Sequence, residues 1–379
     1  MNHSPFRLLL LPLSWLYGLI VGIRNILFNL EILPSRSFDV PVISIGNITV
    51  GGTGKTPHTE YLINALSKDF QLAVLSRGYK RQTKGFVLAT EQSTVTEIGD
   101  ESVQIKRKFP FVTVAVDENR CRGIDQLLEL KDSPFIDVVL LDDAFQHRYV
   151  SPCISILLID HSRLIKEDYL LPAGELRESA SEMRRAQIVI VTKCPIDLNP
   201  MALRIIGSKI GILPYQSLFY TSQVLGSLQP LFPNTDATTQ AENEKIESTF
   251  VPKDLEELQQ KQTPLLIVTG IAKPANFESA IKAYSNNVKS LFFADHHEFN
   301  KRDVRKIKFE FEKIKSSGGI ILTTEKDATR IRKNAWMTDL YPYIFYPTLE
   351  IKFLGGEEMT FLHKITDYVK INRRNRTVS

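Results

Sequence analysis

Residues 42–57, VISIGNITVGGTGKTP, constrain the fold of this chain more than any other segment. A β-branched run leads into a glycine-rich turn, then into Gly54-Lys55-Thr56, and then into an amphipathic stretch. A strand, a glycine-rich loop and a helix in this order form a P-loop, whose backbone N–H groups wrap nucleotide phosphates, whose lysine reaches the outer phosphates and whose hydroxyl binds Mg²⁺. The expected nucleotide site comprises Ile48, Thr49, Val50, Gly51, Gly52, Thr53, Gly54, Lys55 and Thr56.

The loop departs from the usual pattern at one position. In G-x-x-x-x-G-K-[ST] the first glycine would fall at Thr49. Gly51 and Gly52 still supply a permissive backbone. A glycine-rich turn without chemical consequence is the alternative, and the agreement of loop, lysine, hydroxyl and flanking elements argues against it.

A hydrophobic run that begins at Ile136 ends in two adjacent acids, Asp142 and Asp143. Carboxylates at the end of a strand facing a P-loop are suited to holding Mg²⁺ and orienting the reacting groups. Such a pair alone is more often a solvated turn, but the P-loop upstream favours a metal site made of Thr56, Asp142 and Asp143.

Short β-rich runs alternate with amphipathic stretches, which predicts βαβ units and a parallel sheet. We expect an α/β fold: a P-loop NTPase-type parallel sheet with helices on both faces, a second, smaller α/β domain, and an apolar N-terminal helix. The predicted strands are 40–45, 71–75, 111–116, 136–141, 154–159 and 188–192, then 265–269, 288–293 and 319–323; predicted helices include 57–67 and 120–130. The predicted domains are 1–33, 34–205 and 206–379, with a mobile insert near 233–263 that is poor in bulky apolar residues.

Composition excludes several classes of protein. The formal net charge of +4 gives no strong attraction for nucleic acid. The three cysteines are odd in number and form no CxxC pair, so neither a disulfide framework nor a zinc site is expected. Thr192-Lys193-Cys194-Pro195 lacks the Asn and Asp with which GTPases read guanine, which argues against guanine selectivity.

The amino terminus is strongly apolar, with no formal charge between Leu8 and Ile23. This run is shorter than the roughly 20 residues that a spanning helix needs, is interrupted by Pro12, Gly18 and Gly22, and is closed by Arg24. We favour a helix that lies in one leaflet and attaches the protein peripherally. A buried core helix and a true span are the alternatives.

Further phrases carry a resemblance to a known family. GNITVGGTGKTP resembles the P-loop of the tetraacyldisaccharide 4'-kinases, the P-loop kinases of lipid A biosynthesis. Other phrases similar to the family's follow in its order: SRGYKR (76–81), GDES (99–102), LLDDAFQHR (140–148), LLPAGELRES (170–179), TGIAKPANF (269–277), FADHHEF (293–299) and TTEKDATR (323–330). Ala144 stands where the family usually has Gly, and the loop around 235–258 looks longer than typical.

The resemblance implies transfer of the ATP γ-phosphate to the 4'-hydroxyl of a tetraacyldisaccharide 1-phosphate, forming lipid IVA, with ATP and Mg²⁺ required. It also implies a peripheral position on the cytoplasmic face of the bacterial inner membrane, where the lipid A precursor lies. No nucleic acid and no obligate protein partner are implied. A partner-regulated P-loop NTPase of the switch or metallochaperone type, without lipid kinase activity, is the alternative; a degenerate scaffold and a soluble sugar or nucleoside kinase explain less.

The resemblance also assigns roles. The catalytic candidates are Lys55, Asp142, Asp143, Asp100 as base, and His296 as its partner across a domain cleft, with His297 left open as a substitute. Arginine forks match phosphate oxygens, so a second group is expected to bind substrate, although a surface salt bridge is the alternative for each: Arg77, Arg120, Gln146, His147, Arg177 and Glu178. Lys326 and Asp327 are candidates for nucleotide contact or cleft closure, and Arg373, Arg374 and Arg376 form a basic tail.

Overall fold

The computed structural model describes residues 9–130, 135–165, 168–232, 252, 254–295, 297–332 and 334–377, with side chains up to residue 372. The chain forms two compact units. The first unit comprises Met1–Gln223 and Ile351–Ser379, and the second comprises Val224–Glu350. The predicted insert near 233–263 lies largely outside the described residues, and so does His296.

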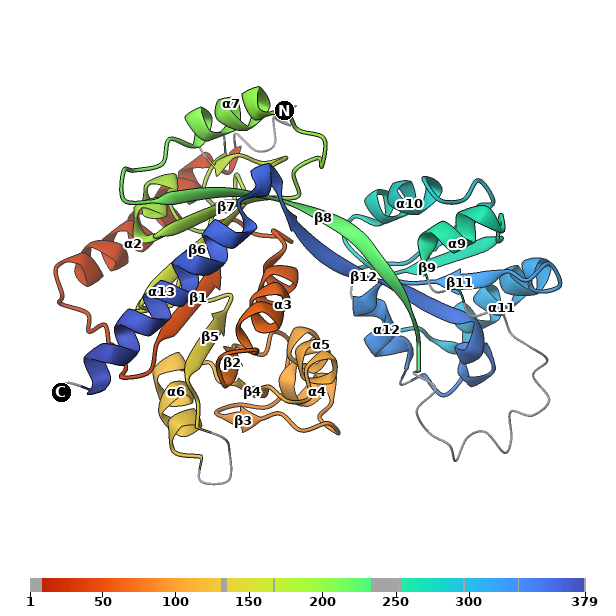
Figure 1. Ribbon diagram of the computed structural model, residues 1–379, viewed down its shortest axis with the longest axis horizontal. Helices are drawn as coiled ribbons and strands as arrows, with labels where there is room; N and C mark the ends of the chain where they lie inside the picture. Colours follow the sequence, from red (N-terminus) through yellow and green to blue (C-terminus); the bar gives the residue numbers. More distant parts are fainter. Residues whose placement is uncertain are drawn as a thin grey trace. The chain divides into compact units, whose positions relative to one another are not determined.

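The first unit is built on a mostly parallel sheet (Figure 1). Its strand order is β8-β7-β6-β1-β5-β2-β4-β3, and only the β3–β4 pair is recorded as antiparallel among its described pairings. The bounds are β1 Val42–Gly46, β2 Leu72–Ser76, β3 Val87–Leu88, β4 Thr113–Val116, β5 Val138–Asp142, β6 Ile154–Asp160, β7 Ile188–Thr192 and β8 Ser217–Pro230. Strands β1, β2, β5, β6 and β7 are buried along their whole length. Burial on both faces explains why they read as continuous apolar runs.

Alternate side chains of these strands contribute to two hydrophobic layers, one on each face of the sheet. On one face, α3 (Lys55–Leu66), α5 (Asp100–Lys108) and α13 (Glu358–Thr377) pack against side chains such as Val74 and Leu140. On the other face, α6 (Arg120–Leu128) covers Leu75 and Leu141, and α7 (Pro200–Ile210) packs near β6 and β7. Helices therefore cover both faces, as predicted.

The second unit is a smaller α/β layer structure. Its strands follow the order β10-β9-β11-β12, and each recorded pair is parallel. Helices α11 and α12 pack on one face, and α9 and α10 pack on the other. The bounds are α9 Leu255–Gln260, β9 Leu265–Thr269, α10 Pro274–Lys282, β10 Val288–Phe292, α11 Lys301–Lys315, β11 Ile320–Leu322, α12 Glu325–Ile331 and β12 Ile344–Phe353; short elements elsewhere are α4 Val95–Ile98, η2 Ala180–Arg185, η3 Thr338–Tyr343 and η4 Leu354–Gly356.

The unit boundaries differ from the predicted boundary near residue 205 and from a second domain running to residue 379. Strand β8 adds to the first sheet beside β7, so the chain leaves the first unit only after Gln223. The carboxyl-terminal helix α13 returns to the first unit because Phe361, Ile365 and Val369 belong to its core. Sequence patterning did not predict β8, β12 or α13.

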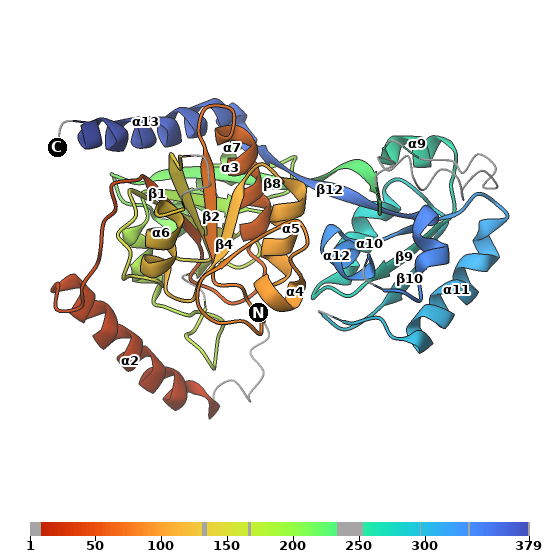
Figure 2. The ribbon, with the colours of Figure 1, turned by 90° about the horizontal axis from the view of Figure 1, so that it is seen from below.

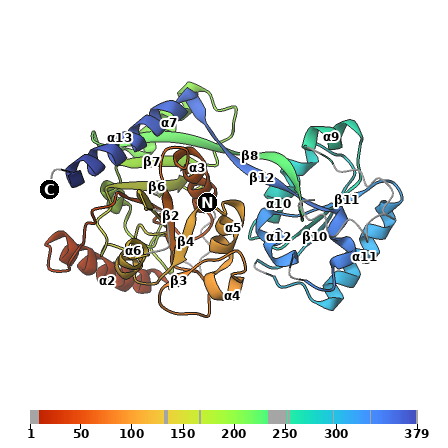
Figure 3. The ribbon, with the colours of Figure 1, turned by 60° about the horizontal axis from the view of Figure 1, so that its bottom comes forward.

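Helix α2 spans Leu11–Asn29 and is the apolar N-terminal helix that the sequence predicts. It runs through Gly18 and Gly22 without a break and continues past Arg24, where the uncharged run of the sequence ends. In Figure 2, α2 and α13 lie on opposite sides of the first unit, and Figure 3 shows the same separation. By length and composition α2 could cross a membrane.

Candidate nucleotide and phosphate-transfer site

The P-loop connects β1 to α3 in the conformation that its glycines permit. Gly51 and Gly54 have φ of 95° and 88°, in the left-handed region that favours glycine. A Cβ on Gly54 would lie 2.6 Å from Nε2 of Gln223, so the space beside this residue is also filled. Lys55 and Thr56 occupy the first turn of α3, where backbone N–H groups have no partner within the helix. This turn is therefore a ready anion site.

A second segment, 175–177, lines the first arm of the P-loop. The Val50 amide donates to the Glu175 carbonyl at 2.8 Å, and the Arg177 amide donates to the Ile48 carbonyl at 2.8 Å. Nε2 of Gln146 donates to the Asn47 carbonyl at 2.7 Å. These contacts place residues 170–179 and 140–148 beside the P-loop. The side chain of Gln146 is bonded to the backbone of this loop.

Asp143 joins the P-loop lysine to Arg177. Its Oδ1 lies 3.6 Å from Nζ of Lys55 and 3.4 Å from Nη1 of Arg177. Asp143 has φ of 47°, an uncommon conformation for a residue with a side chain. Residues in such conformations concentrate at functional sites. The sequence predicted Lys55, Asp143 and Arg177 separately, and the structure brings them together.

Asp142 precedes it at the end of β5 and is fully buried. Its Oδ1 accepts a hydrogen bond from Thr59 at 3.1 Å. Burial, followed by the charges of Glu101 and Asp143, raises the pKa of Asp142 to about 7. A desolvated carboxylate beside another acid is a place where a divalent cation would relieve repulsion.

The oxygen donors here fit Mg²⁺. Thr56 and the two carboxylates are hard ligands of the kind that Mg²⁺ prefers. Over the ranges that the structure describes, no group of three or more His, Cys, Asp or Glu forms a complete cage. Mg²⁺ commonly binds through one or two carboxylates and takes its other ligands from water and substrate phosphates, so an incomplete protein cage is consistent with such a site.

Arg120 is buried close to these acids, and the half-buried His147 lies near Arg120. Burial lowers the pKa of Arg120 to about 10, while the charge of Asp143 acts in the opposite direction. Burial, and then the charges of Arg120, Arg24 and Arg77, lower the pKa of His147 to about 4. Among the described residues, Nε of Arg120 and Nε2 of His147 are buried without a hydrogen-bond partner. Buried unpaired polar atoms beside a cluster of cations fit a site that receives an anionic ligand.

Glu178 has a different environment from its neighbour Arg177. It is buried, forms a close ion pair with Arg185 and accepts a hydrogen bond from Nδ2 of Asn25 at 3.4 Å. Burial raises the pKa of Glu178. These contacts tie the 170–179 segment to helix α2, and the Tyr17 hydroxyl adds a 2.8 Å bond to the Arg177 carbonyl.

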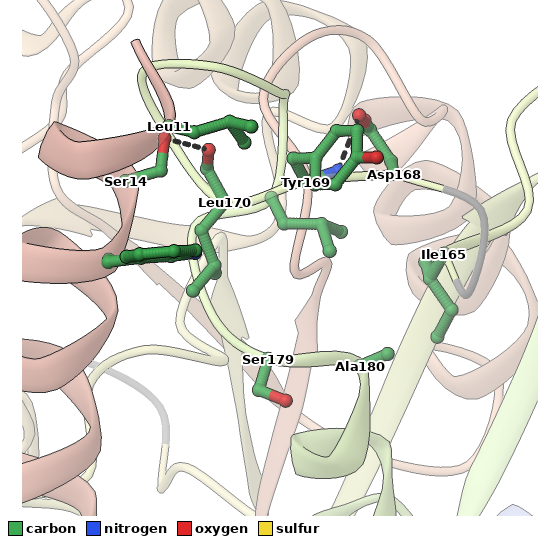
Figure 4. Close-up of a pocket in the computed structure, with 10 residues that line it drawn as sticks. Leu11, Ser14, Ile165, Asp168, Tyr169, Leu170, Ser179 and Ala180 are labelled. Atoms are coloured by element: carbon green, nitrogen blue, oxygen red, sulfur yellow. Dashed lines mark hydrogen bonds between the residues drawn. The ribbon is translucent and has the colours of Figure 1, made fainter. Parts of the chain in front are cut away.

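A pocket of about 280 Å³ lies where α2 meets this segment (Figure 4). Its lining is mainly apolar, with Ser14 bonded to the Leu170 carbonyl at 2.9 Å. The lining residues are Leu11, Ser14, Trp15, Ile165, Asp168, Tyr169, Leu170, Leu176, Ser179 and Ala180.

The proposed base, Asp100, is the first residue of α5 and follows Gly99, whose φ is 85°. In the second unit, His297 contacts Asp303 at 2.8 Å and stacks on Phe293. These contacts give His297 a structural role. Asp327 is also engaged: it is buried and accepts hydrogen bonds from Thr269 at 2.7 Å and from the Gly270 amide at 3.0 Å. Asp327 therefore joins the first turn of α12 to the end of β9 and does not face solvent.

Sequence reasoning missed the side chains that hold the P-loop from outside. Nδ1 of His58 lies 2.7 Å from the Gly54 carbonyl, and the Thr192 hydroxyl lies 2.8 Å from the Thr53 carbonyl. Lys193 contacts the Gly52 carbonyl and Asp160. Thr192 and Lys193 lie where GTPases carry the residues that recognise guanine, and this position in the sequence was a signal that they lie near the nucleotide. No sequence signal pointed to His58.

Comparison with known proteins decides the family. The family model described as Tetraacyldisaccharide-1-P 4'-kinase matches residues 6–370. This chain belongs to that family. Curated relatives named tetraacyldisaccharide 4'-kinase include one from Bacteroides thetaiotaomicron, 51% identical over 98% of this chain and 95% of the relative. Another, from Flavobacterium johnsoniae, is 41% identical over 97% of this chain and 98% of the relative.

A solved member of the family has the same fold. The crystal structure of LpxK from Aquifex aeolicus, described as a complex with ATP, has a TM-score of 0.72 and 28% sequence identity to this chain. The likeness covers 96% of this chain and 99% of that protein. The fold class and the family resemblance predicted from sequence are confirmed.

Proposed function

We propose that this chain transfers the γ-phosphate of ATP to the 4'-hydroxyl of a tetraacyldisaccharide 1-phosphate, forming lipid IVA. The observation that carries the proposal is the contact of Asp143 with both Lys55 and Arg177, beside the buried Asp142 and the P-loop. Family membership supports a kinase over the alternative of a partner-regulated NTPase without lipid kinase activity.

ATP phosphates would lie over the first turn of α3. The backbone N–H groups of Gly54, Lys55 and Thr56 and the ammonium of Lys55 would neutralise charge on the phosphates. Lys55 is mostly buried next to Asp143, which limits its motion to the neighbourhood of the transferred group. Phosphoryl transfer depends mainly on such positioning and charge stabilisation.

Thr56, Asp142 and Asp143 would hold Mg²⁺. When bound, the ion supplies positive charge to the phosphate oxygens. The chain's contribution is the donor set itself, and the hydrogen bond from Thr59 keeps the Asp142 carboxylate in place. A bound cation would stabilise the ionised form of the Asp142 carboxylate.

Asp100 would accept the proton of the 4'-hydroxyl, with His296 as its partner. The support is the position of Asp100 at the start of α5 and the family's Asp–His pair. A carboxylate base with a histidine neighbour can be oriented and tuned for proton transfer. His296 lies outside the described residues, and His297 is engaged with Asp303.

The anionic disaccharide would meet the cations Arg77, Arg120 and Arg177, with the neutral ring of His147 and the amide of Gln146 nearby. The effects of Arg77 and Arg120 on the pKa of His147 indicate that these groups share one electrostatic environment. Glu178 would act indirectly, by holding the 170–179 segment through Arg185.

Helix α2 would attach the protein to the cytoplasmic face of the inner membrane. Ser14, Asn25 and Phe28 are buried against the first unit. Much of the remaining surface of α2 is apolar and 50–75% exposed: Leu13, Trp15, Leu16, Leu19, Ile20, Ile23 and Ile26. Hydrogen bonds from Ser14, Tyr17 and Arg24 fasten the helix side-on to the body, which favours a helix lying in one leaflet over one that crosses it.

The test is a transfer assay with γ-³²P-labelled ATP, Mg²⁺ and tetraacyldisaccharide 1-phosphate in detergent micelles. We expect the label in the lipid, with a mass gain of one phosphate. Hydrolysis of ATP without labelling of the lipid would instead support the partner-regulated NTPase.

A further inference from the structure

The carbonyls of three consecutive P-loop residues accept hydrogen bonds from side chains. Two of these side chains follow or end β7, and the third lies one turn further along α3. Gly52 is contacted by Lys193, Thr53 by Thr192, and Gly54 by His58. Thr192 and Lys193 lie at and just after the end of β7, and His58 lies in α3. None of these three side chains has a place in the catalytic scheme above.

Peptide geometry gives these contacts a consequence. In a trans peptide the C=O of one residue and the N–H of the next lie in one plane and point in opposite directions. Holding the Thr53 and Gly54 carbonyls outward therefore directs the N–H groups of Gly54 and Lys55 the other way, into the loop. The third peptide joins Gly52 to Thr53. Its N–H, on Thr53, donates to the Gly51 carbonyl at 3.1 Å and so closes the turn.

His58 is held in one protonation state and tautomer. A carbonyl can only accept, so Nδ1 of His58 donates to Gly54, and Nε2 accepts from the Thr221 hydroxyl at 3.0 Å. Burial lowers the pKa of His58 to about 4, so the ring is neutral at physiological pH. Thr221 belongs to β8, two residues before Gln223, whose side chain adjoins Gly54.

Lys193 and Thr192 are likewise fixed. Nζ of Lys193 lies 2.8 Å from the buried Asp160 carboxylate, which Ser162 also bonds at 2.7 Å. Lys193 has φ of 57°, an uncommon backbone conformation that its contacts must maintain. The Thr192 hydroxyl is 3.3 Å from the Ile159 carbonyl, so its shorter contact is the one to Thr53.

We propose that His58, Thr192 and Lys193 are positioning residues that hold the outer carbonyls of the P-loop and so preorganise its N–H groups for the phosphates of ATP. They do not touch the nucleotide. They hold the loop in its binding conformation before the phosphates arrive. Less conformational entropy is then lost on binding, as with other preorganised donors. The inference rests on the proposed function in that it takes ATP as the ligand of this loop.

Matched variants test the Thr192 contact. Thr192→Val keeps the shape and removes the hydroxyl, and Thr192→Ser restores the hydroxyl. Binding of Mg·ATP and of inorganic tripolyphosphate to the full-length protein is measured by titration calorimetry, well below the melting temperature and without lipid. We expect about tenfold weaker binding of both ligands for Thr192→Val, and near wild-type binding for Thr192→Ser.

Substitutions at His58 give a second, independent pair of variants. His58→Leu removes both bonds, whereas His58→Asn places an amide donor where Nδ1 stood. We expect about tenfold weaker ATP binding for the leucine variant and partial recovery for asparagine, with a raised KM for ATP and an unchanged KM for lipid. His363→Leu, on an exposed part of α13, is the control for loss of a histidine.

Wild-type ATP affinity in Thr192→Val and His58→Leu would overturn the proposal, and so would equal losses in each member of a pair. A change in melting temperature without a change in ATP affinity would also overturn it, since that is the result of a merely structural role. If Thr192→Val cannot be purified folded, the His58 pair decides. A protein that binds ATP in this pattern but never labels lipid contradicts the proposed function and leaves this inference standing.

Discussion

Nζ of Lys55 lies 3.6 Å from Oδ1 of Asp143, so the lysine of the P-loop is paired with the acid that directly follows β5. Arg177 approaches the same carboxylate oxygen at 3.4 Å. One carboxylate therefore holds two cations at the place where the outer phosphates are proposed to lie. An arriving phosphate could exchange with this carboxylate for the same cations, because both are oxyanions.

Replacing Lys55 by Ala is expected to lower kcat by at least about a hundredfold, because a charge that stabilises the transferred phosphate is lost. The measurement is the initial rate of lipid labelling at saturating ATP. Lys68→Ala, an exposed lysine in the turn that follows α3, is the matched control and should keep the wild-type rate. A Lys55→Ala variant with more than about half of the wild-type rate would contradict the assignment.

Asp100→Asn is expected to lower kcat by about 10²–10⁴, the range that general bases contribute. The substitution conserves shape, so affinity for Mg·ATP should stay within about twofold of wild type. Equal ATP affinity together with a slow transfer step places Asp100 in proton transfer. A normal kcat in the variant removes Asp100 as the base.

The pH dependence of stability should report Asp142. Its folded-state pKa of about 7 exceeds the ordinary value of about 4. Between these two values the folded protein binds a proton that the unfolded chain has lost, so stability decreases as pH rises from 4 to 7 and then levels off. In Asp142→Asn this component is absent, and the variant should be more stable than wild type at pH 8 in the absence of Mg²⁺.

Urea midpoints at pH 5 and pH 8 measure this difference. The comparison between the two proteins isolates Asp142, since the other titrating groups are common to both. Parallel pH profiles for wild type and Asp142→Asn would show that Asp142 keeps an ordinary pKa.

Glu178→Gln should affect stability more than substrate recognition. It leaves the half-buried Arg185 guanidinium without its closest carboxylate, although Glu182 remains 2.9 Å away. We expect a loss of about 3 kcal/mol in the free energy of unfolding, at the low end for a broken buried ion pair. Chemical denaturation measures the loss; a stable variant with a raised KM for lipid would instead assign Glu178 to substrate binding.

Membrane attachment through α2 is tested with vesicles that contain anionic lipids. Ile20→Asp places a charge on the exposed apolar surface of the helix and should reduce co-sedimentation at least tenfold, because a carboxylate is costly to place among acyl chains. Ile371→Asp, an exposed apolar residue of α13, should bind vesicles like wild type. Equal losses in both variants would argue against α2 as the attachment site.

The sequence predicted the parts of the site that are local in the chain. The loop before Lys55 and the acids at 142 and 143 could be recognised because strand, turn and helix follow one another without interruption. It did not predict contacts between distant segments, such as Thr192 with Thr53 or Glu178 with Arg185. Neither α13 nor its return to the first unit was predicted, because the spacing of its apolar residues does not indicate which core receives them.

The proposed function depends on phosphorylation of the 4'-hydroxyl. The most direct measurement compares two acceptors in the wild-type transfer assay, tetraacyldisaccharide 1-phosphate and its 4'-deoxy analogue, with γ-labelled ATP and Mg²⁺. We expect the first acceptor to gain one labelled phosphate at the 4' position and the analogue to stay unlabelled. Labelling of the 4'-deoxy analogue, or ATP turnover that labels neither lipid, would rule out the proposed 4'-kinase activity.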